Sequence, residues 1–540
     1  MKKVHVKELQ ARLLGTLTDH PDTLQWLSTD ASIFSVLPTA VVYPQNTADV
    51  RKVVQYAAER AETGKPLSIV ARGLGSSTTG ASLDEGLVLA MPAHMHKLLR
   101  LDAHTVTVQP GINLAALQQV LHTHNRWLPG LPDDAATATI GGSVATNAAG
   151  ARSLKYGPLR RAVKSLKVVL SDGSLIKTER LSARELNRKK GHATLEGEIY
   201  RQIDSLLLDH PGLIKKHTPH VARNASGYAL SEIRHPDGSF DLSQLFIGSE
   251  GTLGIITEIT LATAPHNPRT TLVVGYFDSV ERAAAAITKL RALAPSALEL
   301  IDAATLEHIR EHRPADLEGL VPEKLPKIVL FAEFDDFSQV SQKFRTVRAQ
   351  RILARNKAAS RVATDPVEQV ALWKLRWTAG NRQTTSARQP LPFINDAVVP
   401  VDKLPQLIEK AAKLLTKYDL ESPIYGHAGD ANLTLAPALD LSRKRDVDKL
   451  FNLLREYAEL VVSLGGSPTG SHGDGLLHAP HLAKLYGTEI AELYDAVKRA
   501  CDPKSIFAPN HKTGATEAYA RAHLRTEYSR ARFADYPNQS

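Results

Sequence analysis

Short apolar runs and helical apolar stripes alternate along the first half of the chain. Residues 105–108, 163–170 and 254–261 are apolar and β-branched over strand length, and Gly, Asp-Gly or Ser clusters bound them. Between such runs, residues 48–60 and 114–124 place apolar side chains three and four positions apart, the spacing of one helix face. This mixture of periods predicts an α+β or α/β domain.

A second pattern of strands and helices begins after a proline-containing boundary. Pro265 and Pro268 stand among polar residues, a composition that marks turns and domain boundaries. Beyond them the sequence predicts a strand over 270–277, a helix over 279–293 and a strand over 328–333. The chain is therefore expected to divide into domains at about this point.

The two ends of the chain differ from the rest. Leucines recur at helical spacing between positions 9 and 17, so residues 1–35 are interpreted as a helical lead-in. The basic start leads into a polar stretch rather than an apolar run, which is not the pattern of a signal peptide. Residues 513–540 are polar and arginine-rich and are interpreted as a C-terminal tail.

Composition narrows the class of protein. The 540 residues are 43% hydrophobic and 23% charged, which is ordinary for a globular protein of a few domains. No run approaches the length of a transmembrane helix. Cys501 is the only cysteine, which excludes disulfides within the chain and a cysteine-ligated iron–sulfur cluster. We therefore expect a soluble, cytoplasmic protein.

The charge balance is positive, with 66 basic and 57 acidic residues and a net charge of +9. Nucleic acid is not an expected partner, because no block of five or more basic residues occurs and aromatic residues make up only 6% of the chain. The balance suits a small anionic substrate, an acidic partner protein or the inner face of a membrane. Peripheral membrane contact is therefore an alternative to a wholly cytoplasmic location.

A loop of glycine and small polar residues joins two predicted strands near residue 75. Thr78 stands where a dinucleotide fingerprint would have its third glycine, and no helix follows the loop. Its backbone N–H groups and hydroxyls can still bind phosphate, with an arginine as a further donor. Taken alone, the loop is equally an ordinary connection between strands. Its candidate ligands are Arg72, Gly73, Gly75, Ser76, Ser77 and Gly80.

Two further segments are rich in glycine. Between positions 129 and 150 most side chains are small, and none is charged after Asp134, which suits a backbone that approaches a large flat ligand. Because the run is so long, we interpret it as a cofactor cradle rather than a packing turn. Residues 246–259 place three glycines before an alternating strand, and Glu250 among them needs a partner if it is buried.

These three segments, in their order and spacing, resemble the FAD-binding domain of the vanillyl-alcohol oxidase / PCMH-type flavoprotein superfamily. The resemblance covers residues 36–265 and implies that the first loop holds the FAD pyrophosphate while the other two segments line the flavin. The FAD is expected to be noncovalent, because no His or Cys stands at 72–80, the usual tethering position. Beyond the first loop, the implied cofactor ligands are Gly111, Pro132, Thr139, Gly141, Gly142, Ser143, Asn147, Gly150, Glu250, Gly251, Gly254, Ile255 and Ile256.

Four motifs of the second half resemble the D-2-hydroxyacid dehydrogenase branch, which contains D-lactate, D-2-hydroxyglutarate and glycolate dehydrogenases. They resemble its LWxxR, EDVAVPV, GHxGDGNLH and GEHGDG segments and stand at 372–376, 395–401, 423–434 and 465–475. The resemblance implies an α+β protein, in which a PCMH-type FAD-binding domain of two subdomains precedes a ferredoxin-like α+β substrate (cap) domain. That second domain would span 266–512, with its last part, about 465–512, returning to the flavin.

The branch implies a FAD-dependent dehydrogenase or oxidase that converts a D-2-hydroxy acid, such as D-lactate, to the 2-oxo acid. Arg376 matches its carboxylate-binding arginine, and a guanidinium can clamp a carboxylate through two hydrogen bonds. His472 matches the histidine beside the flavin, and an imidazole can take the hydroxyl proton near neutral pH. His427 and Asn432 match residues that would orient the substrate oxygen.

Three positions depart from the pattern of the branch. Thr434 and Ser471 replace a His and a Glu that bind a divalent metal in some members, so no metal site is expected. Ala508 replaces an Asn that usually approaches the flavin. These departures keep open a catalytically reduced FAD-binding protein, beside a flavin oxidase of sugar or aldonolactone alcohols. A non-redox enzyme like alkylglycerone-phosphate synthase fits less well, because its site is His-rich where this chain has Ser471 and His472.

The electrons of a reduced flavin would have to leave to a separate acceptor, because a single cysteine cannot hold an iron–sulfur cluster. A quinone, a cytochrome or an electron-transfer flavoprotein fits this role, and direct oxidation by oxygen is the alternative. The sequence does not indicate an oligomeric state.

Overall fold

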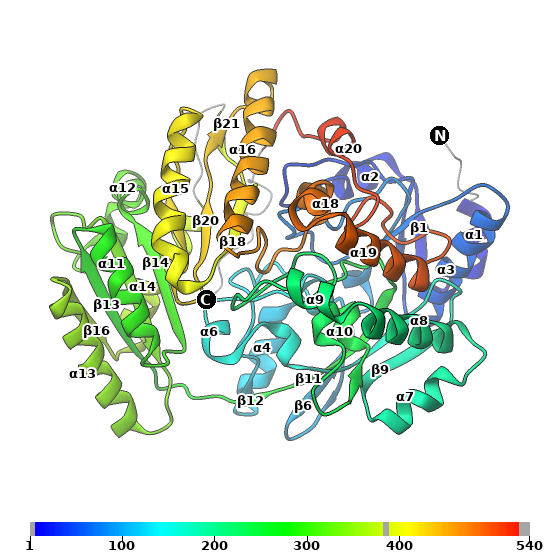
Figure 1. The fold of residues 1–540 in the computed structure, drawn as a ribbon, viewed down its shortest axis with the longest axis horizontal. Helices are drawn as coiled ribbons and strands as arrows, with labels where there is room; N and C mark the ends of the chain where they lie inside the picture. Colours follow the sequence, from blue (N-terminus) through cyan, green and yellow to red (C-terminus); the bar gives the residue numbers. More distant parts are fainter. Residues whose placement is uncertain (1–5, 382–387, 529–540) are drawn as a thin grey trace.

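The structure is a computed structural model that describes residues 6–381 and 388–528 (Figure 1). One side of the molecule in this view contains the strands and helices up to about residue 265, together with the C-terminal helices α18 and α19. The other side contains the helices and strands between about residues 271 and 463. Among the described residues, no helix is long and apolar enough to cross a membrane.

A four-stranded sheet in the order β1-β2-β4-β3 begins the first half. The strands β2, β4 and β3 are parallel, and β1 adds to β2 antiparallel. Asn46 caps α3, whose buried valines pack on this sheet. The bounds are β1 Thr16–Thr18, β2 Ala40–Tyr43, α3 Thr47–Glu62, β3 Ile69–Arg72 and β4 Leu87–Ala90.

The N-terminal segment differs from the expected helical lead-in. The helix α1 (Val6–Arg12) ends before Leu17, which lies in β1, and α2 (Pro21–Leu27) follows. The carboxylate of Asp49 accepts hydrogen bonds from the backbone N–H groups of Leu14 and Gly15 and so turns the chain. Pairing with β2 then overrides the helical spacing of the leucines, and the expectation of a helix through residue 17 is wrong.

A six-stranded antiparallel sheet in the order β10-β9-β8-β11-β6-β5 completes the first half. Alternate residues of β11 are buried, as expected of a strand with one face on a core. Its strands are β5 Leu98–Leu101, β6 Thr105–Val108, β8 Val163–Val169, β9 Leu175–Leu181, β10 Phe240–Asp241 and β11 Ile255–Ala262. The accompanying elements are α4 Leu114–Thr123, β7 Arg126–Trp127, α5 Ile140–Ala145, α6 Ser153–Tyr156, α7 Ala183–Lys190, α8 Leu195–Asp209, α9 Pro211–His217, α10 Ser243–Phe246 and β12 Ala264–Pro265.

The second half is built on a seven-stranded antiparallel sheet, in the order β16-β13-β15-β14-β19-β20-β18. Successive residues of β13 point to opposite faces: Val273 joins the core under α11 and α13, whereas Leu272 and Val274 join the core under α12 and α14. The strands are β13 Thr271–Phe277, β14 Ala297–Asp302, β15 Ile328–Phe334, β16 Ala359–Ala363, β18 Ile394–Val398, β19 Ile424–His427 and β20 Asn432–Leu435. The other elements are α11 Val280–Arg291, α12 Ala303–His312, α13 Gln339–Arg355, α14 Pro366–Thr378, β17 Gln389–Pro390, α15 Leu404–Lys417, β21 Ala438–Leu439 and α16 Lys444–Ser463.

After α16 the chain crosses back to the first half. It forms α17 Gly475–His478, α18 Leu482–Tyr486, α19 Thr488–Cys501 and α20 Glu517–Ala522. The helix α19 contacts α8, and the backbone of Ile69 in β3 is hydrogen-bonded to Ile506 and Ala508. Beyond residue 512, Leu524 forms a bridge with Phe34, so the described part of the expected tail is docked on the protein; residues 529–540 lie outside the described range.

Candidate functional site

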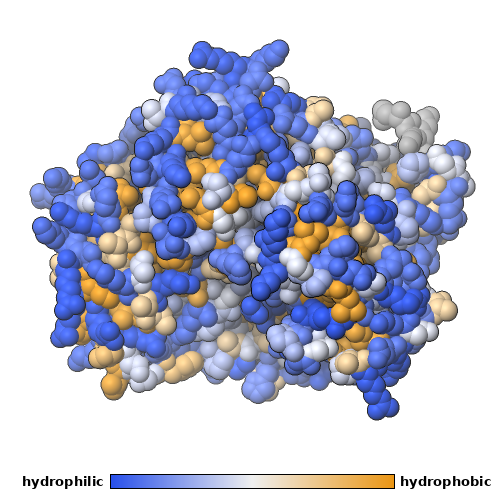
Figure 2. Space-filling model, in the orientation of Figure 1, coloured by the Kyte–Doolittle hydropathy of each residue, from blue (hydrophilic) through white to orange (hydrophobic). Residues whose placement is uncertain are grey.

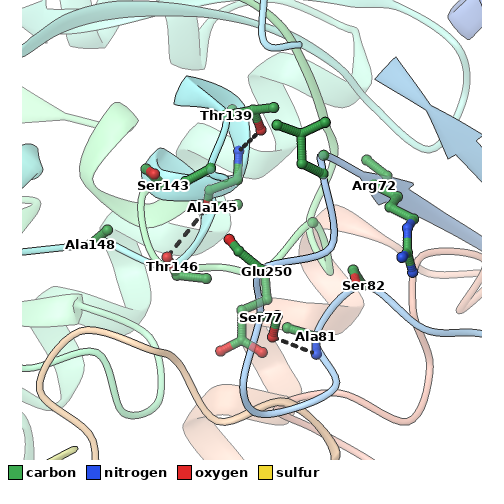
Figure 3. A pocket seen from close by; sticks show the side chains of 18 of the residues that line it. Arg72, Ser77, Ala81, Ser82, Thr139, Ser143, Ala145, Thr146, Ala148 and Glu250 are labelled. Atoms are coloured by element: carbon green, nitrogen blue, oxygen red, sulfur yellow. Dashed lines mark hydrogen bonds between the residues drawn. The ribbon is translucent and has the colours of Figure 1, made fainter. Parts of the chain in front are cut away.

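The three glycine-rich segments meet around one cavity of about 1060 Å³, part of which is open to solvent (Figure 3). The loop after β3, the segment around α5 and the turn before β11 each supply part of its wall. The expected cofactor ligands that line it are Arg72, Gly73, Gly75, Ser76, Ser77, Pro132, Thr139, Gly141, Gly142, Ser143, Glu250, Gly251, Gly254 and Ile256. His472 also lines the cavity, from the C-terminal part of the chain.

The remaining expected cofactor ligands lie beside the cavity. Asn147 donates through its side chain to the carbonyl of Asn224, and Ile255 is buried in the core under β3 and β4. Three glycines allow close packing: an added Cβ would lie 3.0 Å from Phe34 at Gly80, 2.6 Å from the Met91 carbonyl at Gly111 and 2.1 Å from the Leu131 carbonyl at Gly150. These residues shape the wall from outside the cavity.

Arg72 fixes the shape of the first loop. Its buried guanidinium donates to the backbone carbonyls of Thr29 at 2.7 Å and Leu27 at 3.2 Å. Burial raises the pKa of the neighbouring Asp30 carboxyl, and the charge of Arg72 opposes this effect. Gly75 has a φ of +79° and lies against the same guanidinium, since an added Cβ would be 2.4 Å from Arg72 Nη2. A side chain at Gly75 would therefore displace the arginine.

The helix α5 begins where the second segment reaches the cavity. Thr139 accepts a hydrogen bond from the backbone N–H of Gly142 at 3.3 Å, and Thr146 donates to the carbonyl of the same glycine at 3.2 Å (Figure 3). An added Cβ at Gly141 would lie 2.5 Å from Cβ of Pro110. The small residues of this segment therefore pack against the protein and also leave room in the cavity.

Glu250 has its expected partner in a buried network. Lys512 Nζ lies 2.9 Å from Glu250 Oε1 and 2.7 Å from Asp474 Oδ2, and all three residues are at most 4% exposed. Glu250 also accepts from the backbone N–H groups of Asp474 and Gly475. Burial alone would lower the pKa of Lys512, but the two carboxylates raise it above its usual value. This network holds the C-terminal segment against the cavity.

His472 reaches the cavity on a loop that Asp396 holds. The buried Asp396 carboxylate accepts from the backbone N–H groups of Ser471 at 2.7 Å and His472 at 2.8 Å. Burial alone would raise the pKa of Asp396, but His472 and the hydrogen bonds lower it. The side-chain amide of Asn432 also donates to Asp396, at 3.0 Å, so the structure places Asn432 under this loop with its donor engaged.

Arg376 and His427 lie together around the buried Glu299. Arg376 Nε donates to Glu299 Oε2 at 2.8 Å, and Arg376 Nη2 lies 3.4 Å from Asp133 Oδ2. His427 Nδ1 lies 2.8 Å from Glu299 Oε1, so the other ring nitrogen points away from the glutamate. Burial alone would lower the pKa of Arg376, but Glu299 and Asp133 raise it. Glu299 thus orients both an arginine and a histidine that the sequence had singled out.

Two consecutive aspartates connect this cluster to the cavity. Burial alone would raise the pKa of Asp133, but the charges of His427 and Arg376 lower it. Asp134 lines the cavity, and burial raises the pKa of its carboxyl while the charge of His472 opposes the shift. Because consecutive Cα atoms are about 3.8 Å apart, the cluster around Glu299 adjoins the cavity on the side of His472.

Within the described ranges, Asp133, Glu299 and His427 place ligand atoms within 4.8 Å of one another, a separation that could hold a metal ion. The guanidinium of Arg376, however, already donates to Glu299 and lies beside Asp133. It supplies the positive charge that a metal would bring. Thr434 and Ser471 direct their hydroxyls to the carbonyl of Asn395 and to Asp396. That no metal binds here stays a prediction.

The sequence interpretation missed several residues of the site. Glu299 and Asp396 are acidic residues inside the buried strands β14 and β18, and a carboxylate in an apolar run is a detectable sign of a buried polar contact. Asp134 stood at the edge of the small-residue segment without a role. The pairing of Lys512 with Glu250 joins positions far apart in the chain, and no local pattern could have shown it.

Comparisons with known proteins match both halves of the chain to families. The FAD binding domain matches residues 38–179, and the C-terminal domain of FAD linked oxidases matches residues 266–511. The chain is 29% identical over 516 residues to a D-2-hydroxyglutarate dehydrogenase of Escherichia coli (strain K12), covering 92% of this chain and 50% of that protein. It therefore spans half the length of that relative.

Two other relatives are covered over most of their length. The glycolate oxidase subunit GlcD of Bacillus subtilis (strain 168) is 27% identical over 484 residues, covering 88% of this chain and 89% of the relative. The D-lactate dehydrogenase of Archaeoglobus fulgidus is 27% identical over 475 residues, covering 87% of this chain and 90% of the relative.

Solved structures share the fold at low identity. An alkyldihydroxyacetonephosphate synthase has a TM-score of 0.61 at 18% identity, covering 93% of this chain and 84% of the other. The 4-ethylphenol oxidase from Gulosibacter chungangensis has a TM-score of 0.67 at 14% identity, covering 95% of this chain and 97% of the other. The expectation of an α+β PCMH-type flavoprotein fold is confirmed.

The cavity fits the cofactor of this family. An added Cβ at Gly251, where φ is +75°, meets nothing within 4 Å, so the backbone leaves space there for a bound group. Hydroxyls of Ser76, Ser77 and Ser143 and the glycine backbone offer hydrogen bonds to phosphate and to ring edges. The expectation of FAD is confirmed. With its FAD binding domain and the C-terminal domain that follows it, the chain belongs to the FAD-linked oxidase family of FAD-dependent oxidoreductases.

Proposed function

We propose that this protein oxidises a D-2-hydroxy acid, such as D-lactate, to the 2-oxo acid. The observation that carries the proposal is the position of His472, which lines the same cavity as the three glycine-rich segments. The names of the relatives, D-2-hydroxyglutarate dehydrogenase, glycolate oxidase subunit and D-lactate dehydrogenase, support this substrate class. FAD, when bound, supplies the hydride acceptor for such an oxidation.

In this proposal His472 takes the proton of the substrate hydroxyl, because an imidazole is a suitable base near neutral pH. The charge of His472 acts on the carboxyls of both Asp134 and Asp396, so these two residues lie close to it. The hydrogen bonds from the loop backbone to Asp396 hold His472 in place before the substrate arrives. Preorganisation of this kind lowers the entropy cost of the reaction.

Arg376 and His427 hold the substrate from the cap domain. Arg376 uses Nε and Nη2 for Glu299 and Asp133, which leaves Nη1 for the substrate carboxylate. His427 is held at Nδ1 by Glu299 and directs its other nitrogen to the substrate oxygen. Asn432 supports the His472 loop through its hydrogen bond to Asp396. The electrons then pass to an external acceptor, for which a quinone, a cytochrome or an electron-transfer flavoprotein is suitable.

Anaerobic mixing of the purified yellow protein with a panel of acids tests the proposal. D-Lactate, D-2-hydroxyglutarate or glycolate should bleach the flavin absorbance, and the L-enantiomers should not. Bleaching by sugar or aldonolactone alcohols alone would assign another oxidase activity. If no alcohol bleaches the flavin while dithionite does, the chain is a FAD-binding protein without this activity, a second candidate that Thr434, Ser471 and the buried Ala508 favour.

Gly251→Val should weaken FAD binding, because the new side chain would enter the cavity at a residue with positive φ. Overpacking of this kind costs about 1–3 kcal/mol, or roughly 5-fold to 150-fold in Kd. Titration of the apoprotein with FAD, followed by fluorescence quenching, measures the effect. Gly64→Val is the matched control, because Gly64 also has a positive φ, +70°, and open space around it but does not line the cavity. Equal losses in both variants would show that strain alone is responsible.

The FAD should be noncovalent and the enzyme independent of metal. Acid precipitation should release the flavin intact, because the loop at 72–80 contains no His or Cys. Flavin reduction should be unchanged after dialysis against a chelator, since Arg376 occupies the position between Glu299 and Asp133. Stoichiometric zinc or manganese in elemental analysis, with chelator-sensitive reduction, would instead assign a metal to Asp133, Glu299 and His427.

A further inference from the structure

The helix α13 exposes an apolar stripe on the outer face of the second half. Phe337, just before the helix, is 67% exposed, and Val340, Phe344 and Val347 are 81%, 61% and 37% exposed. Positions 340, 344 and 347 are four and three residues apart, so their side chains share one helix face. We call these four residues the α13 stripe.

The opposite face of α13 accounts for the packing of the helix. Its buried residues are Gln342, Thr346, Ala349 and Leu353, and they lie against the sheet at β13 and β16. The three stripe residues that lie within the helix, at positions 340, 344 and 347, each stand two positions before a buried residue. Two positions correspond to a rotation of about 200° around a helix, so the stripe faces away from the sheet. The stripe is therefore not needed for the core of the protein. Figure 2 shows hydrophobic atoms among hydrophilic ones at the lower left edge, where α13 lies in Figure 1.

The charges of α13 are all positive. Between residues 339 and 355 the helix contains five basic residues, Lys343, Arg345, Arg348, Arg351 and Arg355, and no acidic one. Arg345 lies 3.3 Å from Asp336, whereas no ion pair within the described part of the chain involves the other four basic residues. The guanidinium of Arg348 lies 5.4 Å from the centre of the Phe344 ring, so basic and apolar side chains are interleaved on the surface.

We propose that the outer face of α13 docks on a membrane surface that contains anionic lipid. Helices that lie in the membrane interface insert Phe and aliphatic side chains at the acyl boundary and place Lys and Arg at the headgroups. The stripe and the unpaired basic residues of α13 provide both contacts. Four side chains on a single helix form a surface much smaller than the roughly 800 Å² per partner of a stable protein complex, which favours lipid over a protein partner.

Such docking would attach the second half of the protein to a bilayer while leaving the cavity of the first half free. The sheet of the second half separates α13 from α14, which covers its other face, so only one face is turned to the lipid. The inference stands apart from the proposed substrate, because none of its residues lines the cavity or belongs to the cluster around Glu299.

Sedimentation with vesicles tests the proposal on the FAD-loaded full chain. The parent should sediment at low salt with phosphatidylcholine vesicles that contain about one third phosphatidylglycerol, and much less with phosphatidylcholine alone. High salt should weaken the binding, because it screens the basic residues. Val340→Ser with Phe344→Ser should reduce the bound fraction at least about tenfold, since both inserted side chains are lost. Arg348→Gln and Arg351→Gln should each reduce affinity about fivefold.

The control variant is Val367→Ser with Val370→Ser on α14, whose valines are 78% and 48% exposed on the other side of the sheet. It should bind vesicles as the parent does. Failure of the parent to sediment with anionic vesicles would overturn the proposal, as would equal losses in the α13 and α14 variants. Concentration-dependent self-association that Phe344→Ser abolishes would show instead that the stripe joins two copies of the chain.

Discussion

Lys512→Met should destabilise the protein by about 3–5 kcal/mol, the usual cost of leaving buried charges without their partner. The substitution removes the cation between the carboxylates of Glu250 and Asp474, both of which are at most 4% exposed. Methionine keeps most of the volume of the lysine, so the loss reports charge rather than a cavity. Urea unfolding of the apoprotein measures it without a contribution from bound FAD.

The effect should extend to the cofactor, because Glu250 lines the cavity and binds the backbone of residues 474 and 475. In the parent protein the ion pair contributes at neutral pH, since the pKa of Lys512 is raised, and its contribution is lost only as pH rises through that raised value. Lys504→Met is the matched control, because Lys504 pairs with Glu62 at the surface and should cost less than about 1 kcal/mol. Similar losses of unfolding free energy in both variants would show that the buried ion pairs of Lys512 contribute no more to stability than a surface ion pair does.

The elements with a clear local period could be predicted from the sequence. The strand expected at 105–108 is β6 (Thr105–Val108), and the helix expected at 279–293 is α11 (Val280–Arg291). In both segments the local spacing of apolar residues and the burial against a core favour the same structure. At Leu17 they disagree: the leucine spacing favours a helix, but Asp49 turns the chain and β2 pairs with it. A contact between distant residues decides there, and no short window of sequence contains it.

The candidate site likewise has one part that the local sequence could predict and another part that it could not. The glycine-rich segments around the cavity could be recognised because a wall made of backbone requires small residues at consecutive positions of the sequence. The cluster of Arg376, His427 and Glu299 could not be predicted as a unit, because it forms only when β14 pairs with β19 and α14 packs over them. Sequence motifs brought Arg376 and His427 to attention separately. The structure adds the glutamate that connects them and shows that most of the arginine fork is already engaged.

Because Arg376 already binds Glu299, the Arg376→Lys variant can distinguish two roles of the arginine: binding the substrate carboxylate, or only orienting Glu299 and His427. If Arg376 binds the substrate carboxylate through Nη1, a lysine should weaken substrate binding strongly, because it cannot hold Glu299 and a second carboxylate at once. Saturation kinetics of flavin reduction should then show a higher Kd for the acid and a smaller change in the limiting rate. Arg376→Ala should go further in the same direction. An unchanged Kd in both variants would limit Arg376 to orienting Glu299 and His427.

His472→Ala should slow flavin reduction by about 10²- to 10⁴-fold, the usual loss when a positioned base is removed. The substitution keeps the backbone N–H that donates a hydrogen bond to Asp396, so the loop conformation and FAD binding should be preserved. The loss should therefore appear in the limiting rate of reduction rather than in the Kd for the acid. Anaerobic stopped-flow reduction at several concentrations of the acid separates the limiting rate from Kd. Glu299→Gln provides the contrast, because it disturbs His427 and Arg376 but leaves the His472 loop intact. If His472→Ala is reduced as fast as the parent while Glu299→Gln is slow, the base is His427, whose ring Glu299 already holds with one nitrogen directed away from the carboxylate.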